Sequence, residues 1–158
     1  MDTAQHAAAI LRAFQIEPKP LDRIADEYFL RHRSIGGRFR RDISDAVFGV
    51  ARWQMRLDGW LSISGVRKPS IFDRVLCYLF WQGGAFDLPD HLTLLKKIDF
   101  SAPFDKSFPG GVQGYLSMPQ IFYSRIAARH SSGSFEACEM MNRSISPSLR
   151  VNLLKGGR

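Results

Sequence analysis

The fold is decided by residues 36–61, GGRFRRDISDAVFGVARWQMRLDGWL. A Gly-Gly-Arg step leads into a segment whose apolar residues recur at the spacing of a helix, about 100° per residue. An apolar face of this width predicts one long helix, buried on that side in a helical core. The residues on this face are Phe39, Ile43, Ala46, Val47, Val50, Leu57 and Leu61.

The opposite face of the predicted helix carries a row of charged residues within an arc of roughly 60°. The row consists of Arg38, Arg41, Asp45, Arg52 and Arg56. Gly49 lies in the same row and leaves a gap through which a partner backbone has room to approach. One interpretation pairs Asp45 with Arg41 at i,i+4 spacing and leaves the rest of the face solvated. The other gives the row phosphate partners, and it is favoured because one acid cannot pair all the arginines.

The charge of the whole chain points to a polyanionic partner. The 158 residues include 45% hydrophobic residues, which suits one globular domain, and they carry a formal net charge of +7. Residues 31–41, RHRSIGGRFRR, contain no acid. With two arginines further along the helix, this run gives the candidate RNA-binding set: Arg31, Arg33, Arg38, Arg40, Arg41, Arg52 and Arg56.

Two aromatic residues of the same helix are candidates for stacking on RNA bases. Phe39 and Trp53 lie close to the arginines in sequence. The alternative for both is core packing, which is favoured for Phe39 because it lies on the apolar face, whereas Trp53 lies at the edge of that face.

Most catalytic, metal and membrane functions lack a sequence signal in this chain. Cys77 and Cys138 lie in apolar helical runs, which predicts buried thiols, and neither they nor the histidines have the spacing of metal ligands. No paired acids or phosphate-binding glycine loop suggest an active site, so no catalytic residue is assigned and enzyme activity in this chain is uncertain. Neither a signal peptide nor a run of about 18 apolar residues occurs, so we expect a cytoplasmic protein without a membrane partner.

The remaining sequence predicts an all-α bundle. Helices are expected over residues 3–14, 20–33, 71–82, 117–130 and 135–145, with a short one after Pro89. In the last helix, Phe135, Cys138, Met141 and Ile145 are expected to point inward. Residues 98–116 are expected to be a long connection packed by aromatic side chains. Residues after Pro147 alternate with period two, which predicts a strand that begins a further domain over 147–158, after a helical domain over 1–146.

Two of these stretches resemble a known family. GGRFRRDISDAVFGVARW, residues 36–53, closely resembles the motif in the N-terminal, NusB-like domain of bacterial rRNA cytosine-C5 methyltransferases of the Sun/Nop group. The motif's places are taken by Arg41, Asp45, Phe48, Gly49, Arg52 and Trp53, with Phe48 where tyrosine is usual. SPSLRVNLLK, residues 146–155, looks like the strand that begins the next domain of these enzymes, with Leu153 where threonine is usual.

The resemblance implies a NusB-like helical bundle that binds rRNA and helps to place it for an S-adenosylmethionine-dependent catalytic domain. The family's catalytic cysteines stand in Pro-Cys and Thr-Cys steps, whereas Cys77 follows Leu76 and Cys138 follows Ala137. The resemblance therefore gives this chain no catalytic residue, and S-adenosylmethionine is expected only in a parent enzyme of which this chain is the N-terminal part. Partners are expected to be rRNA and the chain's own catalytic domain.

Two alternatives from other classes remain. In one, the bundle is a protein-interaction module, and its arginines are internal ion-pair partners. In the other, it is a stand-alone NusB-like antitermination factor, against which the predicted terminal strand argues.

Overall fold

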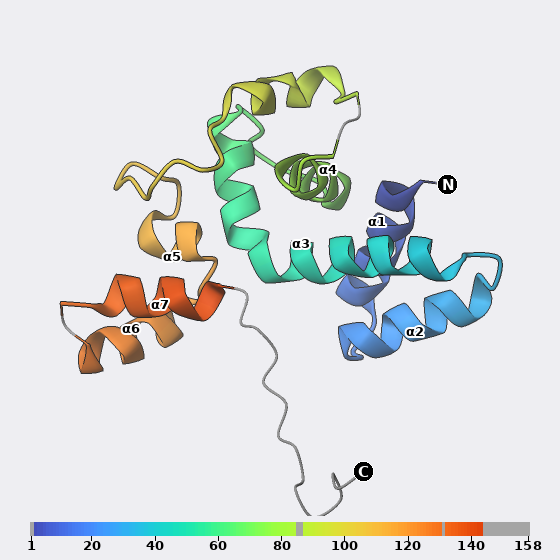
Figure 1. Cartoon of the computed structure of the whole chain (residues 1–158), viewed down its shortest axis with the longest axis horizontal. Coiled ribbons are helices and arrows are strands. Elements are labelled where there is room, and N and C mark those ends of the chain that lie inside the picture. The colour runs from blue at the N-terminus through green and yellow to red at the C-terminus, as the bar shows by residue number, and fades with distance from the viewer. Residues whose placement is uncertain (1, 85–86, 131, 144–158) are drawn as a thin grey trace, which may run out of the picture.

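The computed structural model of the chain describes residues 2–84, 87–130 and 132–143, and no strand occurs among them (Figure 1). This confirms the prediction of an all-α fold. The elements in chain order are α1 (Thr3–Ile16), α2 (Leu21–Arg31), α3 (Gly37–Ile63), α4 (Ile71–Trp81), the 3-10 helix η1 (Asp90–Lys97), α5 (Gly111–Leu116), α6 (Gln120–Arg129) and α7 (Ser134–Asn142).

Helix α3 is the centre of the molecule, and α1, α4, η1 and α5 all pack against it (Figure 1). Its predicted apolar face is buried except for Phe39, which is half-buried. Four of its residues are fully buried, with 0% of their surface exposed: Ile43, Val47, Leu57 and Leu61. The hydrophobic effect on this one face therefore accounts for the position of α3.

Helix α3 spans the predicted range but bends at Trp53, which has non-helical angles of φ −105° and ψ 16°. The bend is visible where the ribbon of α3 turns upward in Figure 1. Just beyond it, the backbone N–H of Met55 donates to Oγ of Ser117 at 3.1 Å. A side chain that bonds into the helical ladder is a recognised cause of such a bend.

The described residues form two hydrophobic cores. The larger core joins α1, α2, α4, η1 and most of α3, and we call this part the N-terminal lobe. The smaller core contains Leu116, Met118 and Cys138, and it joins α5, α6 and α7, which we call the C-terminal lobe. Helix α6 has no buried residue, so the core of the C-terminal lobe is small.

Two expectations about the C-terminal half were wrong. Residues 98–116 are not only a connection, because α5 forms at their end, between Gly110 and Ser117, both in the left-handed region. Met141 does not point inward, since 63% of its surface is exposed. Ile145, the predicted strand and the further domain over 147–158 lie outside the described residues.

Candidate functional site

The turn between α2 and α3 holds the start of α3 in a fixed position. The N–H of Ile35 donates to the carbonyl of His32 at 3.1 Å, and the Ile35 side chain is buried. Arg40 Nε donates to the Ile35 carbonyl at 2.8 Å, and its guanidinium lies 5.6 Å from the centre of the Phe29 ring. Arg40 therefore stabilises the turn by contacts to its backbone and to α2.

Four exposed arginines surround this turn, and we call them the junction arginines: Arg31, Arg33, Arg38 and Arg41. Arg31 lies 3.7 Å from Glu27 Oε2, but Lys19 is closer to that oxygen at 2.9 Å. The hydrogen bond from Lys19 is the main reason why the pKa of Glu27 is lowered. Within the described ranges, no ion pair involves the other three junction arginines. The Arg41–Asp45 pair, which the less favoured interpretation of the arginine row required, does not form among these residues.

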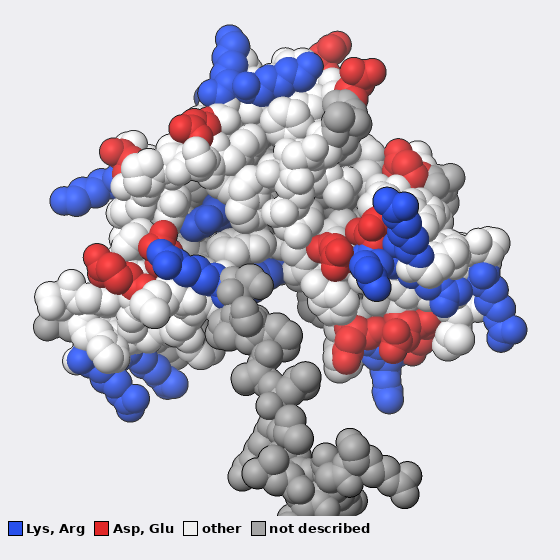
Figure 2. All heavy atoms as spheres, in the orientation of Figure 1, with Lys and Arg blue, Asp and Glu red and all other residues white. Residues whose placement is uncertain are grey.

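The N-terminus of α3 adds partial positive charge to the same place. Gly36 is its N-cap residue and makes no side-chain hydrogen bond, and the N–H of Arg40 donates to the Gly36 carbonyl at 2.9 Å. The amides of the first helical turn have no intrahelical acceptor, and a helix N-terminus favours an anion. In Figure 2, basic side chains project at the end where α2 turns into α3, and acidic side chains lie beside them.

The other two candidate arginines, Arg52 and Arg56, face the C-terminal lobe, and we call them the interlobe arginines. Arg52 donates to the Ser117 carbonyl at 3.3 Å and to the side-chain oxygen of Asn142. Arg56 Nε donates to the Tyr115 carbonyl, and its guanidinium lies 4.0 Å from the centre of the Tyr115 ring. Both side chains therefore join the two lobes.

The environment of Arg56 is partly dehydrated. Burial is the main cause that lowers its pKa, although a guanidinium stays protonated at every ordinary pH. Trp53 lies beside both interlobe arginines, with ring-to-guanidinium distances of 5.2 Å to Arg52 and 4.8 Å to Arg56, and it packs edge-on against Trp81. These contacts favour the packing role of Trp53 over base stacking.

The gap at Gly49 is filled from within the chain. A Cβ atom on Gly49 would overlap the ring of Tyr78, which comes from α4. The space in the arginine row therefore receives a side chain of this chain rather than a partner's backbone. Phe39 packs edge-on against His6 with ring centres 5.6 Å apart, which agrees with its predicted packing role.

The groups that metal or thiol chemistry would use are not assembled into a site in the described part of the chain. No three of its His, Cys, Asp and Glu side chains are grouped closely enough to hold a metal ion. Cys77 and Cys138 are free and buried, as predicted. Burial raises the pKa of Cys77 to about 12, so its thiol stays protonated and unreactive at neutral pH.

Sequence reasoning missed the acceptors of the interlobe arginines. Tyr115 and Ser117 accept through backbone carbonyls, and Asn142 through its side chain, and all three are at least 59 positions away from their donors. A backbone carbonyl has no residue-type signal, so periodicity within α3 could not reveal these contacts.

Comparisons with known proteins give no identification. No protein-family model matches the sequence, and neither a curated protein nor a solved structure matches the chain. No helix of the described residues is both long enough and apolar enough to cross a membrane.

Proposed function

We propose that the chain binds RNA through the junction arginines, as the NusB-like accessory domain of an S-adenosylmethionine-dependent rRNA cytosine-C5 methyltransferase. The observation that carries the RNA interface is the exposed position of Arg33, Arg38 and Arg41 around the uncapped N-terminus of α3, without ion pairs to described acids. The motif over residues 36–53 supports the family and the placing role. The cofactor and the catalytic cysteines would belong to the catalytic domain.

The proposal concerns phosphate groups rather than bases. Guanidinium groups bind phosphate in a bidentate manner, and helix N-termini bind it through backbone N–H groups. Each phosphate contact on a single strand contributes about 0.7 to the slope of log affinity against log salt concentration. Loss of three contacts should therefore reduce that slope by about 2.

The test is a salt titration of binding to fluorescent small-subunit rRNA fragments, measured by anisotropy. The test variant replaces Arg33, Arg38 and Arg41 by glutamine. The control variant replaces Arg125 and Arg129, which are exposed on α6 of the C-terminal lobe. We expect a shallower slope and weaker binding only for the test variant. If a folded test variant keeps the affinity and slope of the wild type, the proposed RNA surface is wrong.

A protein-interaction role is the second candidate, and the surface of the C-terminal lobe favours it. Four large apolar side chains of α6 and α7 are mostly exposed: Ile121 at 59%, Phe122 at 58%, Met140 at 64% and Met141 at 63%. A catalytic domain that docks on this lobe would cover them. Methyl NMR of the chain with and without that domain tests this role, because unchanged Met140 and Met141 signals contradict it.

A further inference from the structure

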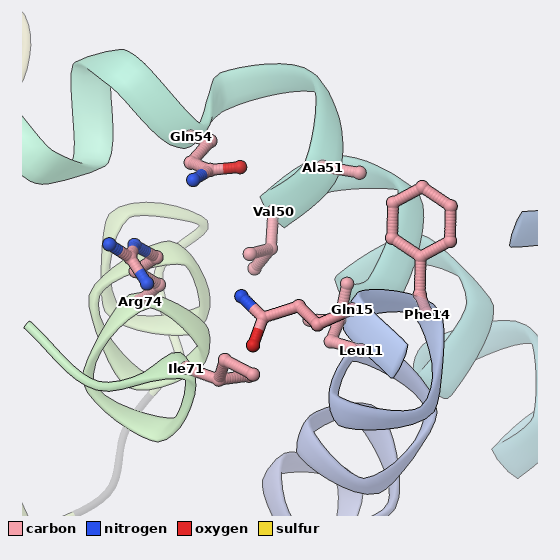
Figure 3. A pocket seen from close by; sticks show the side chains of 8 residues that line it. All are labelled: Leu11, Phe14, Gln15, Val50, Ala51, Gln54, Ile71 and Arg74. Carbon is pink, nitrogen blue, oxygen red and sulfur yellow. The ribbon is translucent and has the colours of Figure 1, made fainter. Parts of the chain in front are cut away.

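A small cavity lies between α1, α3 and α4 (Figure 3). Its walls include the apolar side chains of Leu11, Val50 and Ile71, and its volume is about 120 Å³. Figure 3 shows that the carboxamides of Gln15 and Gln54 extend into the same space from α1 and α3. Apolar walls with a few converging polar groups are the usual composition of a ligand site.

The two carboxamides are available to a ligand. Among the described residues, the side chains of Gln15 and Gln54 form no hydrogen bond, and both residues are exposed at the mouth of the cavity. Each carboxamide carries a donor next to an acceptor. A planar ligand that also has a donor beside an acceptor can therefore form paired hydrogen bonds with either side chain, as amide side chains do with base edges.

The cavity favours a neutral ligand rather than a phosphate. Arg74 is its only charged lining residue, and its guanidinium already binds Asp58 through two hydrogen bonds, of 2.6 and 3.3 Å. The side chain of Arg74 is only 17% exposed. Because the carboxylate neutralises the guanidinium, an anion would gain little there and would lose its hydration.

The volume favours a single ring. A dry cavity of about 150 Å³ in a protein interior holds one benzene molecule. The cavity beside Gln15 is similar in volume but opens to the surface at Phe14 and Gln15, so one six-membered ring fills it and the second ring of a purine would lie outside. Phe14 lines the cavity with 41% of its surface exposed, which makes its ring available for stacking.

We propose that this cavity binds one pyrimidine base of single-stranded RNA, with its edge hydrogen-bonded to Gln15 or Gln54 and its ring against Phe14. The identity of the ligand as an RNA base rests on the proposed function. Ala51, another lining residue, lies ten positions after Arg41 on α3, which corresponds to about 15 Å along the helix axis. A short strand held by the junction arginines can therefore reach the cavity.

The test uses nucleosides, because they lack the phosphate groups on which the junction arginines would act. The full chain, labelled with ¹⁵N, is titrated with cytidine and uridine, and the side-chain NH₂ signals of glutamine are followed by NMR. We expect saturable shifts for Gln15 and Gln54 with a dissociation constant of about 1 mM. Gln82, exposed at the end of α4 and outside this cavity, is the internal control and should not shift.

Substitution of the two glutamines and a purine nucleoside test the hydrogen bonds and the size of the site. The double variant Gln15→Leu/Gln54→Leu keeps the volumes of both side chains and removes the hydrogen bonds of both carboxamides, so it should weaken nucleoside binding by about tenfold without lowering the melting temperature. Adenosine should bind more weakly than cytidine. Tighter binding of adenosine, unchanged binding by the double variant, or the absence of shifts at Gln15 and Gln54 would each overturn the proposal.

The two proposals can fail separately. If nucleosides cause no shifts but the triple arginine variant loses its salt-dependent RNA binding, the base site is wrong and the RNA interface stands. If nucleosides bind in the cavity but the triple variant binds RNA like the wild type, the base site stands and the phosphate surface is wrong.

Discussion

Replacement of Arg56 by methionine should weaken the contact between the two lobes, because this side chain both bonds and stacks on Tyr115 of the C-terminal lobe. The variant loses the hydrogen bond from Nε to the Tyr115 carbonyl and the stacking of the guanidinium on the Tyr115 ring at 4.0 Å. A hydrogen bond from a charged donor contributes about 1.5–3 kcal/mol, and a cation–π contact about 0.5–1 kcal/mol at a partly exposed site. Methionine keeps part of the aliphatic packing, so we expect a net loss of about 2 kcal/mol.

The assay is urea unfolding followed by tryptophan fluorescence, together with hydrogen exchange of the amides. Trp53 and Trp60 both lie near Arg56, at 4.8 and 5.8 Å from its guanidinium, so their emission reports on the joint. Because the C-terminal lobe has a small core, its amides should exchange faster in the variant than those of the N-terminal lobe.

Arg41→Met is the matched control, since Arg41 is an exposed arginine of the same helix. Its free energy of unfolding should change by no more than about 0.5 kcal/mol. Arg56→Lys should lie between the two methionine variants, because it keeps the charge but loses the planar group that stacks on Tyr115. Equal stabilities of the Arg56→Met and Arg41→Met variants would refute the structural role assigned to Arg56.

Three further predictions follow from buried groups. Gly114→Ala should destabilise the protein by about 1–3 kcal/mol, because the new Cβ would overlap the backbone carbonyl of Pro109. Gly37→Ala is the control and should not destabilise it, because the space around its Cβ is open. Urea unfolding compares the two variants. Burial lowers the pKa of His6 from its usual value of about 6.5, so below that pH the unfolded chain binds more protons than the folded protein. The free energy of unfolding should therefore fall as the pH falls through about 6.5. Urea unfolding across this range measures the effect, and His6→Gln should remove it. Burial raises the pKa of Cys77 to about 12, so at pH near 8 this thiol should resist a thiol reagent in the folded protein and react with it in urea. The absorbance of the thiolate that the reagent releases measures both rates, and equal rates would contradict the burial of Cys77.

The sequence predicted the central helix and its buried face well, because both depend on local spacing. Six of the seven predicted apolar residues are buried, and Phe39 is half-buried. The start of α3 could also be predicted, since Gly36 and Gly37 precede a continuous helical pattern. These features need only the helical period and the cost of exposing apolar surface.

Features that depend on distant parts of the chain could not be predicted in the same way. The bend at Trp53 has no proline or glycine at its position, and the group that bonds beside it is the hydroxyl of Ser117. Helix α5 lies in a segment rich in glycine and was expected to be a connection. The cavity with Gln15 and Gln54 needs three helices to be placed before its walls exist.

The position of the C-terminal lobe along α3 explains why neither interpretation of the arginine row describes all of it. A helical wheel assumes one straight axis, so it places Arg41 and Arg56 on a common face. Arg52 and Arg56, on either side of the bend at Trp53, both meet the C-terminal lobe. Arg41, about three helical turns before Arg52, stays exposed. The interpretation with internal partners therefore fits the interlobe arginines, although those partners are carbonyl and amide oxygens rather than acids. The phosphate interpretation can apply only to the junction arginines, so a test of RNA binding that includes Arg52 or Arg56 would confuse loss of contact with loss of fold.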